Sequence, residues 1–191
     1  MAYNESLYKG ITKAAWGYFF LYIHVNINGL DLLPSFVGYL LFLSAFSDLS
    51  QEERELSLLR PLTVLLVLWC TASWLLSIGE ISLVEALPFM DIFVDLVNLY
   101  FHFQFLTNLA SIVAGCGRDV GGMDQKLIKY RNVQTLMLTA SIAVSYLRFY
   151  LYELALWSAA VFSIIYVIAG ICMMILLFKV RRCLFDTEIS A

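Results

Sequence analysis

Apolar segments of near-membrane length follow one another along most of this chain. Residues 62–78 and 154–178 contain no charged side chain, and the second segment is long enough to cross a bilayer with some tilt. Only 14% of all residues are charged, against about 25% in soluble domains. The mean hydropathy is +0.81. Most of the surface must therefore contact lipid, which predicts an all-α, polytopic membrane protein.

Polar connections divide the chain into six predicted membrane helices. Their approximate bounds are residues 12–28, 32–47, 61–79, 88–114, 132–149 and 153–179. If these helices alternate in direction, every Lys and Arg falls on one side of the membrane except Arg148. Because cytoplasmic loops are enriched in Lys and Arg, both termini are predicted to lie in the cytoplasm. Residues 1–191 then form a single integral membrane domain.

The predicted helix 88–114 carries a polar stripe within an apolar segment. Asp91, Asp95, Asn98 and His102 fall within about 60° of one another at the helical rotation of ~100° per residue. Ionisable groups inside a membrane helix are costly unless they are paired or hydrated, and they usually mark a functional site. The stripe is therefore predicted to line a binding site, although His102 taken alone is more typical of a hydrogen-bonded packing residue.

Four further polar residues are predicted to lie at the same outer side of the bundle. Asn26, Asn28 and Asp31 occupy the connection between the first two helices, and Arg148 ends the fifth. Arg148 is the natural partner of the stripe carboxylates, because an intramembrane cation needs an anion. All eight residues can line an outward-facing cavity for a cation, an amine or another polar solute. In the alternative interpretation they form a salt bridge and interhelical hydrogen bonds that only hold the bundle together.

The sequence offers little for metal or catalytic chemistry. Asp91 and His102 lie about 16 Å apart along the helix axis, too far for one metal shell. The Asp91–Asp95 pair can take a cation only with help from Asp31 or Glu80. The four cysteines form no C-x-x-C pair, and no G-x-S-x-G, H-E-x-x-H or P-loop motif occurs. We therefore expect no cofactor, no metal site and no enzymatic activity, and the net charge of −3 gives no support for a nucleic-acid partner.

The first quarter of the chain resembles a group of uncharacterised multispanning membrane proteins from Firmicutes. The shared pattern is Trp-Gly early in the first helix, an Asn-rich connection, Leu-Leu-Pro and then Val-Gly-Tyr. The matching residues are Trp16, Gly17, Asn26, Asn28, Leu32, Leu33, Pro34, Val37, Gly38 and Tyr39. The group often has an acid after the proline, where this chain has Ser35. The resemblance implies a bacterial cytoplasmic-membrane location and carries over no activity.

Three functions fit these observations. The leading hypothesis is a membrane protein without enzymatic activity that binds a solute or ion and takes part in transport. Its size and number of spans are similar to those of the substrate-capturing subunits of energy-coupling-factor transporters, an analogy of architecture alone. The first alternative is a structural or regulatory subunit that packs against another membrane subunit. The second is a membrane enzyme that acts on lipid.

Overall fold

The computed structural model is almost entirely helical, and it describes residues 2–23, 26–27, 30–50, 54–79, 81–115, 122–147 and 152–186. Within these ranges the long helices are α1 (Ala2–Tyr22), α2 (Ser35–Leu49), α3 (Arg60–Ile78), α5 (Pro88–Gly115), α6 (Met123–Leu147) and α7 (Tyr152–Asp186). The short elements between them are strands β1 (Asn26–Ile27) and β2 (Leu30–Asp31), the 3-10 helix η1 (Arg54–Leu59) and helix α4 (Leu83–Ala86). The all-helical class expected from the sequence is confirmed, apart from the two short strands.

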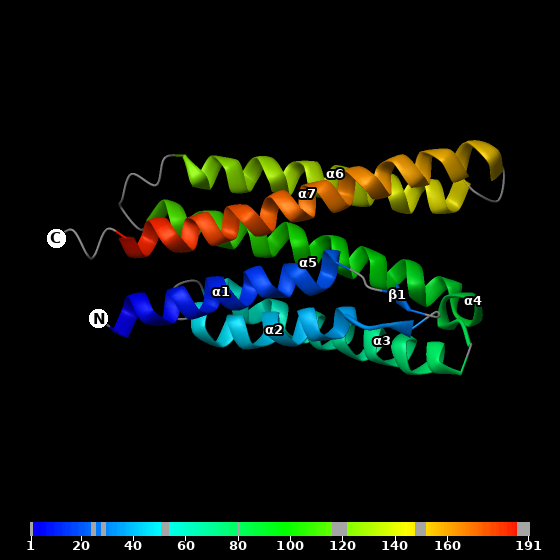
Figure 1. Ribbon diagram of the computed structural model, residues 1–191, viewed down its shortest axis with the longest axis horizontal. Helices are drawn as coiled ribbons and strands as arrows, with labels where there is room; N and C mark the ends of the chain where they lie inside the picture. The colour runs from blue at the N-terminus through cyan, green and yellow to red at the C-terminus, as the bar shows by residue number, and fades with distance from the viewer. Residues whose placement is uncertain are drawn as a thin grey trace.

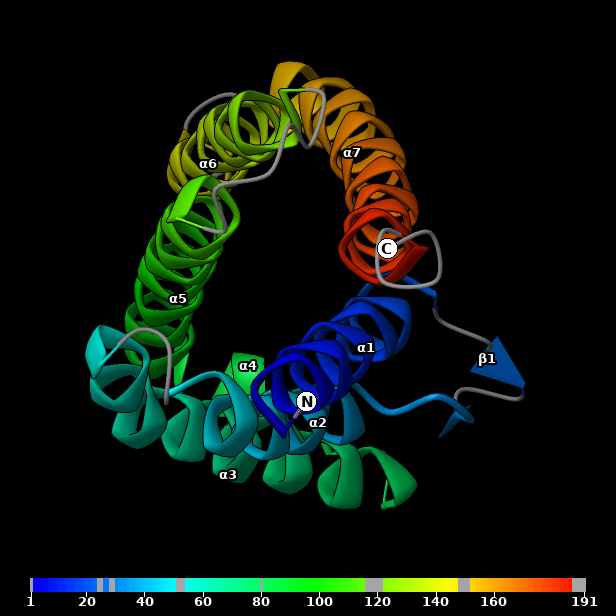
Figure 2. The same cartoon turned by 90° about the vertical axis from the view of Figure 1, so that its left-hand side faces the viewer.

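The long helices run antiparallel to their chain neighbours and close into a ring (Figures 1 and 2). Each helix packs on the next along the chain, with α3 against α5, and α7 packs on α1 to close the ring. The N-terminal end of α1 and the C-terminal end of α7 lie at one end of the bundle, whereas β1 and α4 lie at the other (Figure 1). The alternating directions therefore bring distant parts of the chain together at each end.

Three helices differ clearly in extent from those expected from the sequence. The first helix runs from residue 2 to Tyr22 instead of from 12 to 28, because residues 26–27 pair with residues 30–31 as antiparallel strands. α6 begins at Met123 instead of 132, so a predicted loop is helical. Lys and Arg in that segment are good helix formers, and Leu127 is fully buried. α7 continues beyond residue 179 to Asp186.

Proline marks the start of three helices. Pro34 precedes α2, Pro61 lies in the first turn of α3, and Pro88 is the first residue of α5. Proline suits a helix start because its missing N–H would have no intrahelical partner there. The start at Pro88 places Asp91 in the first turn of α5, at the end of the bundle that carries β1 and α4 (Figure 1).

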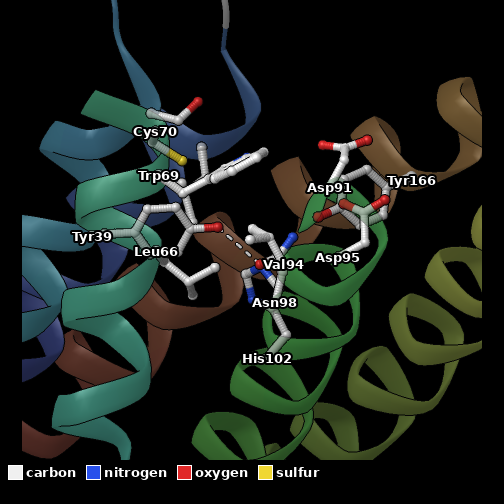
Figure 3. A pocket seen from close by; sticks show the side chains of 12 residues that line it. Tyr39, Leu66, Trp69, Cys70, Asp91, Val94, Asp95, Asn98, His102 and Tyr166 are labelled. Carbon is white, nitrogen blue, oxygen red and sulfur yellow. Dashed lines mark hydrogen bonds between the residues drawn. The ribbon is translucent and has the colours of Figure 1, made fainter. Parts of the chain in front are cut away.

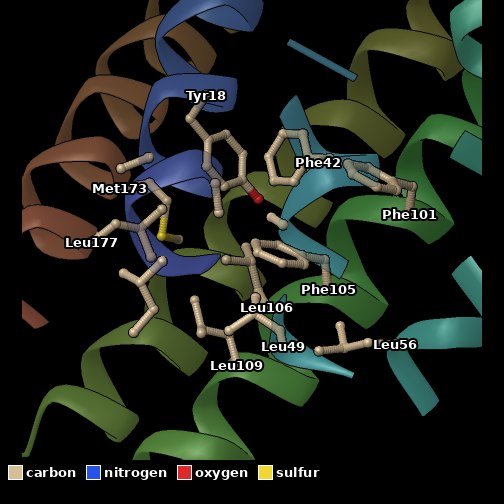
Figure 4. Packing of buried hydrophobic residues seen from close by; sticks show 14 of the residues in the cluster. Tyr18, Phe42, Leu49, Leu56, Phe101, Phe105, Leu106, Leu109, Met173 and Leu177 are labelled. Carbon is tan, nitrogen blue, oxygen red and sulfur yellow. The ribbon is translucent and has the colours of Figure 1, made fainter. Parts of the chain in front are cut away.

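Aromatic side chains fill the space between α1, α2 and α5 (Figure 4). The ring of Phe42 on α2 lies 5.1 Å from that of Phe101 and 5.0 Å from that of Phe105, both on α5. It also lies 5.1 Å from the ring of Tyr18 on α1. All four side chains are fully buried. Edge-to-face pairs contribute about 0.5–1.5 kcal/mol each beyond area burial, so this cluster ties the three helices together.

Among the described residues, three helices are long and apolar enough to cross a membrane, judged by length and composition. They span Glu55–Ile78, Phe89–Gly115 and Ile164–Cys183, and α2 is an apolar helix of shorter length. Large apolar side chains on these helices are widely exposed, as with Leu68 at 66% and Phe89 at 85%. Extended apolar surface of this kind is typical of contact with lipid or another protein. These three candidates overlap three of the six membrane helices expected from the sequence, and the six spans stay a prediction.

Two glycines allow α1 and α2 to approach each other closely. A Cβ atom added at Gly38 would lie 2.8 Å from the carbonyl oxygen of Gly17. A Cβ added at Gly17 would lie 2.8 Å from the ring of Phe42. Small residues permit such close backbone contact between membrane helices, whose association depends on van der Waals packing. These two positions of the N-terminal sequence pattern therefore have a packing role.

Gly38→Ala should lower the melting temperature of the detergent-purified protein by a few degrees. Alanine is favoured over glycine in a helix by up to ~1 kcal/mol, so any loss must come from forcing α1 and α2 apart. The matched control is Gly115→Ala, where the added Cβ meets nothing within 4 Å and stability should not fall. Equal melting temperatures for the two variants would contradict the close contact.

Candidate ligand-binding site

The polar stripe of α5 lines one cavity of about 280 Å³, here called the α5 cavity (Figure 3). The stripe contributes the residues Asp91, Asp95, Asn98 and His102. The opposite face of α5 is apolar and exposed, with Phe89, Phe93, Leu96 and Tyr100 each at 48% or more. The structure thus places the polar face inside the bundle and the apolar face outside, as the helical periodicity predicts.

Four other helices complete the wall of the α5 cavity. The residues that they contribute are Leu21 from α1, Ser35 and Tyr39 from α2, Leu66, Trp69 and Cys70 from α3, and Tyr166 from α7. Asp91, Asp95 and Tyr166 form one side, and Trp69, Cys70 and Tyr39 the other (Figure 3). The sequence analysis assigned no site role to these seven residues. For the polar and aromatic ones, the available signal was their position within an apolar segment, which does not say which helices face each other.

Hydrogen bonds fix the deeper part of the α5 cavity. The Tyr39 hydroxyl donates to Asn98 Oδ1 over 2.8 Å. His102 is only 2% exposed, and its Nδ1 lies 3.3 Å from the Tyr18 hydroxyl. Its ring stacks on that of Tyr18, with 5.5 Å between centroids. These contacts give His102 a packing role at the floor of the cavity, as well as a position facing the cavity.

A second group of polar side chains packs against Tyr166. The ring of Tyr166 on α7 lies 5.0 Å from that of Tyr22 on α1. Gln134 on α6 donates a hydrogen bond from Nε2 to the Tyr22 hydroxyl, and it is only 1% exposed. Sequence reasoning missed Tyr22 and Gln134, because an amide or phenol in the middle of a helix does not reveal its partner. The network connects the cavity wall to α6 through buried polar groups.

The charge of the α5 cavity is negative. Asp91 and Asp95 both face it, and no Lys or Arg is among the described residues that line it. Within the part of the chain that the structure describes, neither carboxylate forms a salt bridge; the salt bridges there join Lys9 to Glu5 and Lys13 to Asp48. Arg148, the partner expected from the sequence, lies outside the described residues. Two carboxylates with no cationic partner among the described residues can attract a cation.

The remaining predicted site residues lie elsewhere. Asp31 lines a neighbouring cavity of about 320 Å³, which shares Ser35, Trp69 and Cys70 with the α5 cavity. Asp31 is also part of the hairpin itself. Its Oδ1 accepts a 3.0 Å bond from the Leu33 N–H, and its carbonyl oxygen accepts a 2.9 Å bond from Trp74 Nε1. Asp31 therefore lies in the neighbouring cavity and does not line the α5 cavity.

Two other predicted residues from the hairpin are less fully placed. The backbone of Asn26 lies in β1 opposite Asp31. Asn28 lies outside the described residues. The stripe of α5 is thus the part of the predicted site that the structure brings together in one place.

The lining of the α5 cavity is acidic and aromatic. Among the described residues, no group of three or more His, Cys, Asp and Glu side chains could hold a metal. The cavity instead combines two carboxylates with the aromatic faces of Tyr39, Trp69 and Tyr166. Aromatic faces attract ammonium groups through the ring quadrupole.

Comparisons of the chain with known protein families, with curated proteins and with solved structures give no match. The resemblance to Firmicutes membrane proteins therefore stays a prediction, and the function has to be argued from the site itself.

Proposed function

We propose that this chain is a multispanning membrane protein that binds a small organic cation in the α5 cavity. One observation supports this most strongly: two carboxylates and three aromatic residues surround one space, without a Lys or Arg among its described lining. Carboxylates supply Coulomb attraction, and aromatic rings supply cation–π attraction. The volume of about 280 Å³ is near the lower end of the ~300–1,000 Å³ found for ligand pockets, which favours a small solute.

In this proposal all six long helices cross a bacterial cytoplasmic membrane, with both termini in the cytoplasm. Ten of the twelve Lys and Arg residues lie within the described ranges. All ten belong to helix segments toward the end of the bundle where α1 begins and α7 ends (Figure 1). The positive-inside rule assigns that end to the cytoplasm. Asp91, near the opposite end, then faces the outer side.

The depth of the α5 cavity supports a role in solute capture. Asp91 lies in the first turn of α5 and is partly exposed, whereas His102 is buried about 16 Å further along the helix axis. Membrane transporters commonly hold their substrates near the middle of the bilayer. A site that extends from the outer end of α5 toward the middle of the bundle therefore fits the capture step of transport.

A ligand panel tests the proposal. The melting temperature of the protein in detergent is measured at neutral pH with methylammonium, tetramethylammonium, benzylamine, sodium ions and acetate. A ligand present at about one hundred times its dissociation constant stabilises a protein by ~2.7 kcal/mol, so a bound amine should raise the melting temperature by several degrees. Sodium and acetate at equal ionic strength should leave it unchanged.

Two variants localise the effect. Asp95→Asn should abolish the shift produced by the amine. Asp124→Asn, which removes a carboxylate from the first turn of α6 rather than from the α5 cavity, should retain it. A shift produced by acetate instead, or an amine shift that survives in Asp95→Asn, would rule out organic-cation binding at this site.

A further inference from the structure

A second cavity lies between α6 and α7, at the opposite end of the bundle from Asp91. Its volume is about 350 Å³, and it is here called the α6–α7 pocket. The first turns of α6 and the last turns of α7 form it, at the end where α1 begins (Figure 1). Its lining includes Lys126, Tyr130 and Lys179 as polar residues and Met123, Ile175 and Leu176 as apolar ones. It thus combines two lysines and a tyrosine with an apolar side.

The polar half of the pocket is positively charged. Lys126 and Lys179 are both exposed, and no acidic residue is among the described residues of the lining. Neither lysine forms a salt bridge within the described ranges, although Asp124 lies in the same first turn of α6 as Lys126. The N-terminal end of a long helix adds a partial positive charge from its peptide dipoles. The pocket can therefore hold an anion between two helices.

The apolar half of the pocket continues as a ridge along α7. Ile175 is 46% exposed, and Ile171, Ile168 and Ile164 follow it toward the middle of the bundle at 36%, 55% and 61%. Their spacing of three or four residues places them on one face of the helix, with Lys179 one turn beyond Ile175 on that face. An anionic head held by the two lysines would thus have an apolar path leading from it into the membrane.

We propose that the α6–α7 pocket binds the phosphate headgroup of an anionic phospholipid from the cytoplasmic leaflet. Lys126 and Lys179 contact the phosphate, the Tyr130 hydroxyl donates to it, and an acyl chain lies along the isoleucine ridge of α7. Basic pockets between membrane helices on the cytoplasmic side are typical sites for anionic headgroups. The inference rests on the membrane placement proposed above, and it is independent of what the α5 cavity binds.

Lipid binding to the purified protein in detergent tests the inference. Phosphatidylglycerol should bind at least about tenfold more tightly than phosphatidylcholine of the same chain length. Lys126→Gln combined with Lys179→Gln should weaken phosphatidylglycerol binding about tenfold to thirtyfold, because each cation near an anionic headgroup contributes attraction. Lys129→Gln is the matched control, since Lys129 is exposed on the same helix and does not line the pocket. It should change binding less than about twofold.

Each contrary outcome has a separate meaning. Equal binding of the two lipids would show that the lysines do not select an anionic headgroup, and an equal loss in Lys129→Gln would leave only diffuse charge attraction. Either result would overturn the site. Glycerol phosphate that binds as tightly as phosphatidylglycerol would replace the lipid by a soluble phosphate ligand. The lysine variants should keep the wild-type melting temperature in lipid-free detergent. Amine binding is measured with soluble ligands in that same detergent, so failure of the α5 cavity proposal would be seen independently of the lipid result.

Discussion

Replacing both Asp91 and Asp95 by asparagine should weaken binding of an organic cation more than a hundredfold and leave the empty protein no less stable. A unit charge about 5 Å from a carboxylate gains ~3 kcal/mol at an effective dielectric of ~20, and a hundredfold change corresponds to ~2.7 kcal/mol. Two carboxylates line the cavity, so loss of both exceeds that figure. Asparagine keeps the shape of each side chain while it removes the charge.

The stability of the same double variant separates a binding site from a structural network. The two carboxylates are one helical turn apart, and like charges at that spacing repel each other. Without a partner for either carboxylate, their removal should leave the melting temperature unchanged or raised. If they instead pair with Arg148, as the structural interpretation of the sequence requires, the variant leaves a cation unpaired inside the membrane and should melt at a clearly lower temperature. Calorimetry of the ligand-free protein and amine titration together provide both readouts.

Periodicity is the reason that the polar stripe could be predicted before the structure. The stripe lies within a single helix, so the rotation per residue is enough to place Asp91, Asp95, Asn98 and His102 on one face. The rest of the lining comes from α1, α2, α3 and α7, and its make-up depends on which helices are neighbours. A tyrosine such as Tyr39 or Tyr166 within an apolar helix is consistent with a core, a lipid interface or a site. Tertiary packing decides between these, and no local pattern encodes it.

The helix boundaries are a second feature that the local sequence pattern did not predict fully. Hydropathy indicates where a chain can lie in lipid, but a helix continues for as long as its residues favour helical backbone. The first eleven residues of the chain and the segment that begins at Met123 are polar, so they were predicted to lie outside the helices. From residue 2 onward and from Met123 onward they are helical instead, and Leu7, Ile11 and Leu127 are buried. A polar segment next to an apolar one can therefore continue the same helix and contribute to its packing.

The aromatic cluster connects the fold to the site. Tyr18 contacts both Phe42 and His102, so the position of the cavity floor depends on how the rings pack. Side chains in lipid gain little from leaving water, and van der Waals contact carries most of their contribution. A ring in the centre of the bundle should therefore matter far more than a ring of equal size at the lipid-facing surface.

Phe42→Ala should reduce the free energy of unfolding by about 2–3 kcal/mol. This is below the ~3–5 kcal/mol typical of buried phenylalanines in soluble proteins. Because lipid is as apolar as the core, the loss of stability comes only from the cavity that is left and from the lost van der Waals contacts. Phe93→Ala is the matched control, since Phe93 is 48% exposed on the outer face of α5, and it should cost less than ~0.5 kcal/mol. Reversible unfolding in mixed micelles measures both variants.

The consequence for binding follows from the same contacts. Loss of the Phe42 ring removes the edge-to-face support of Tyr18, 5.1 Å away, and Tyr18 in turn holds His102 through its hydroxyl. Amine affinity should therefore fall in Phe42→Ala, although the side chain does not line the α5 cavity, and it should recover in part in Phe42→Leu, which refills some of the space. Equal destabilisation by Phe42→Ala and Phe93→Ala would mean that the packing of the central ring contributes no more to stability than an exposed ring does. Destabilisation by Phe42→Ala with unchanged amine affinity would separate the core from the cavity floor.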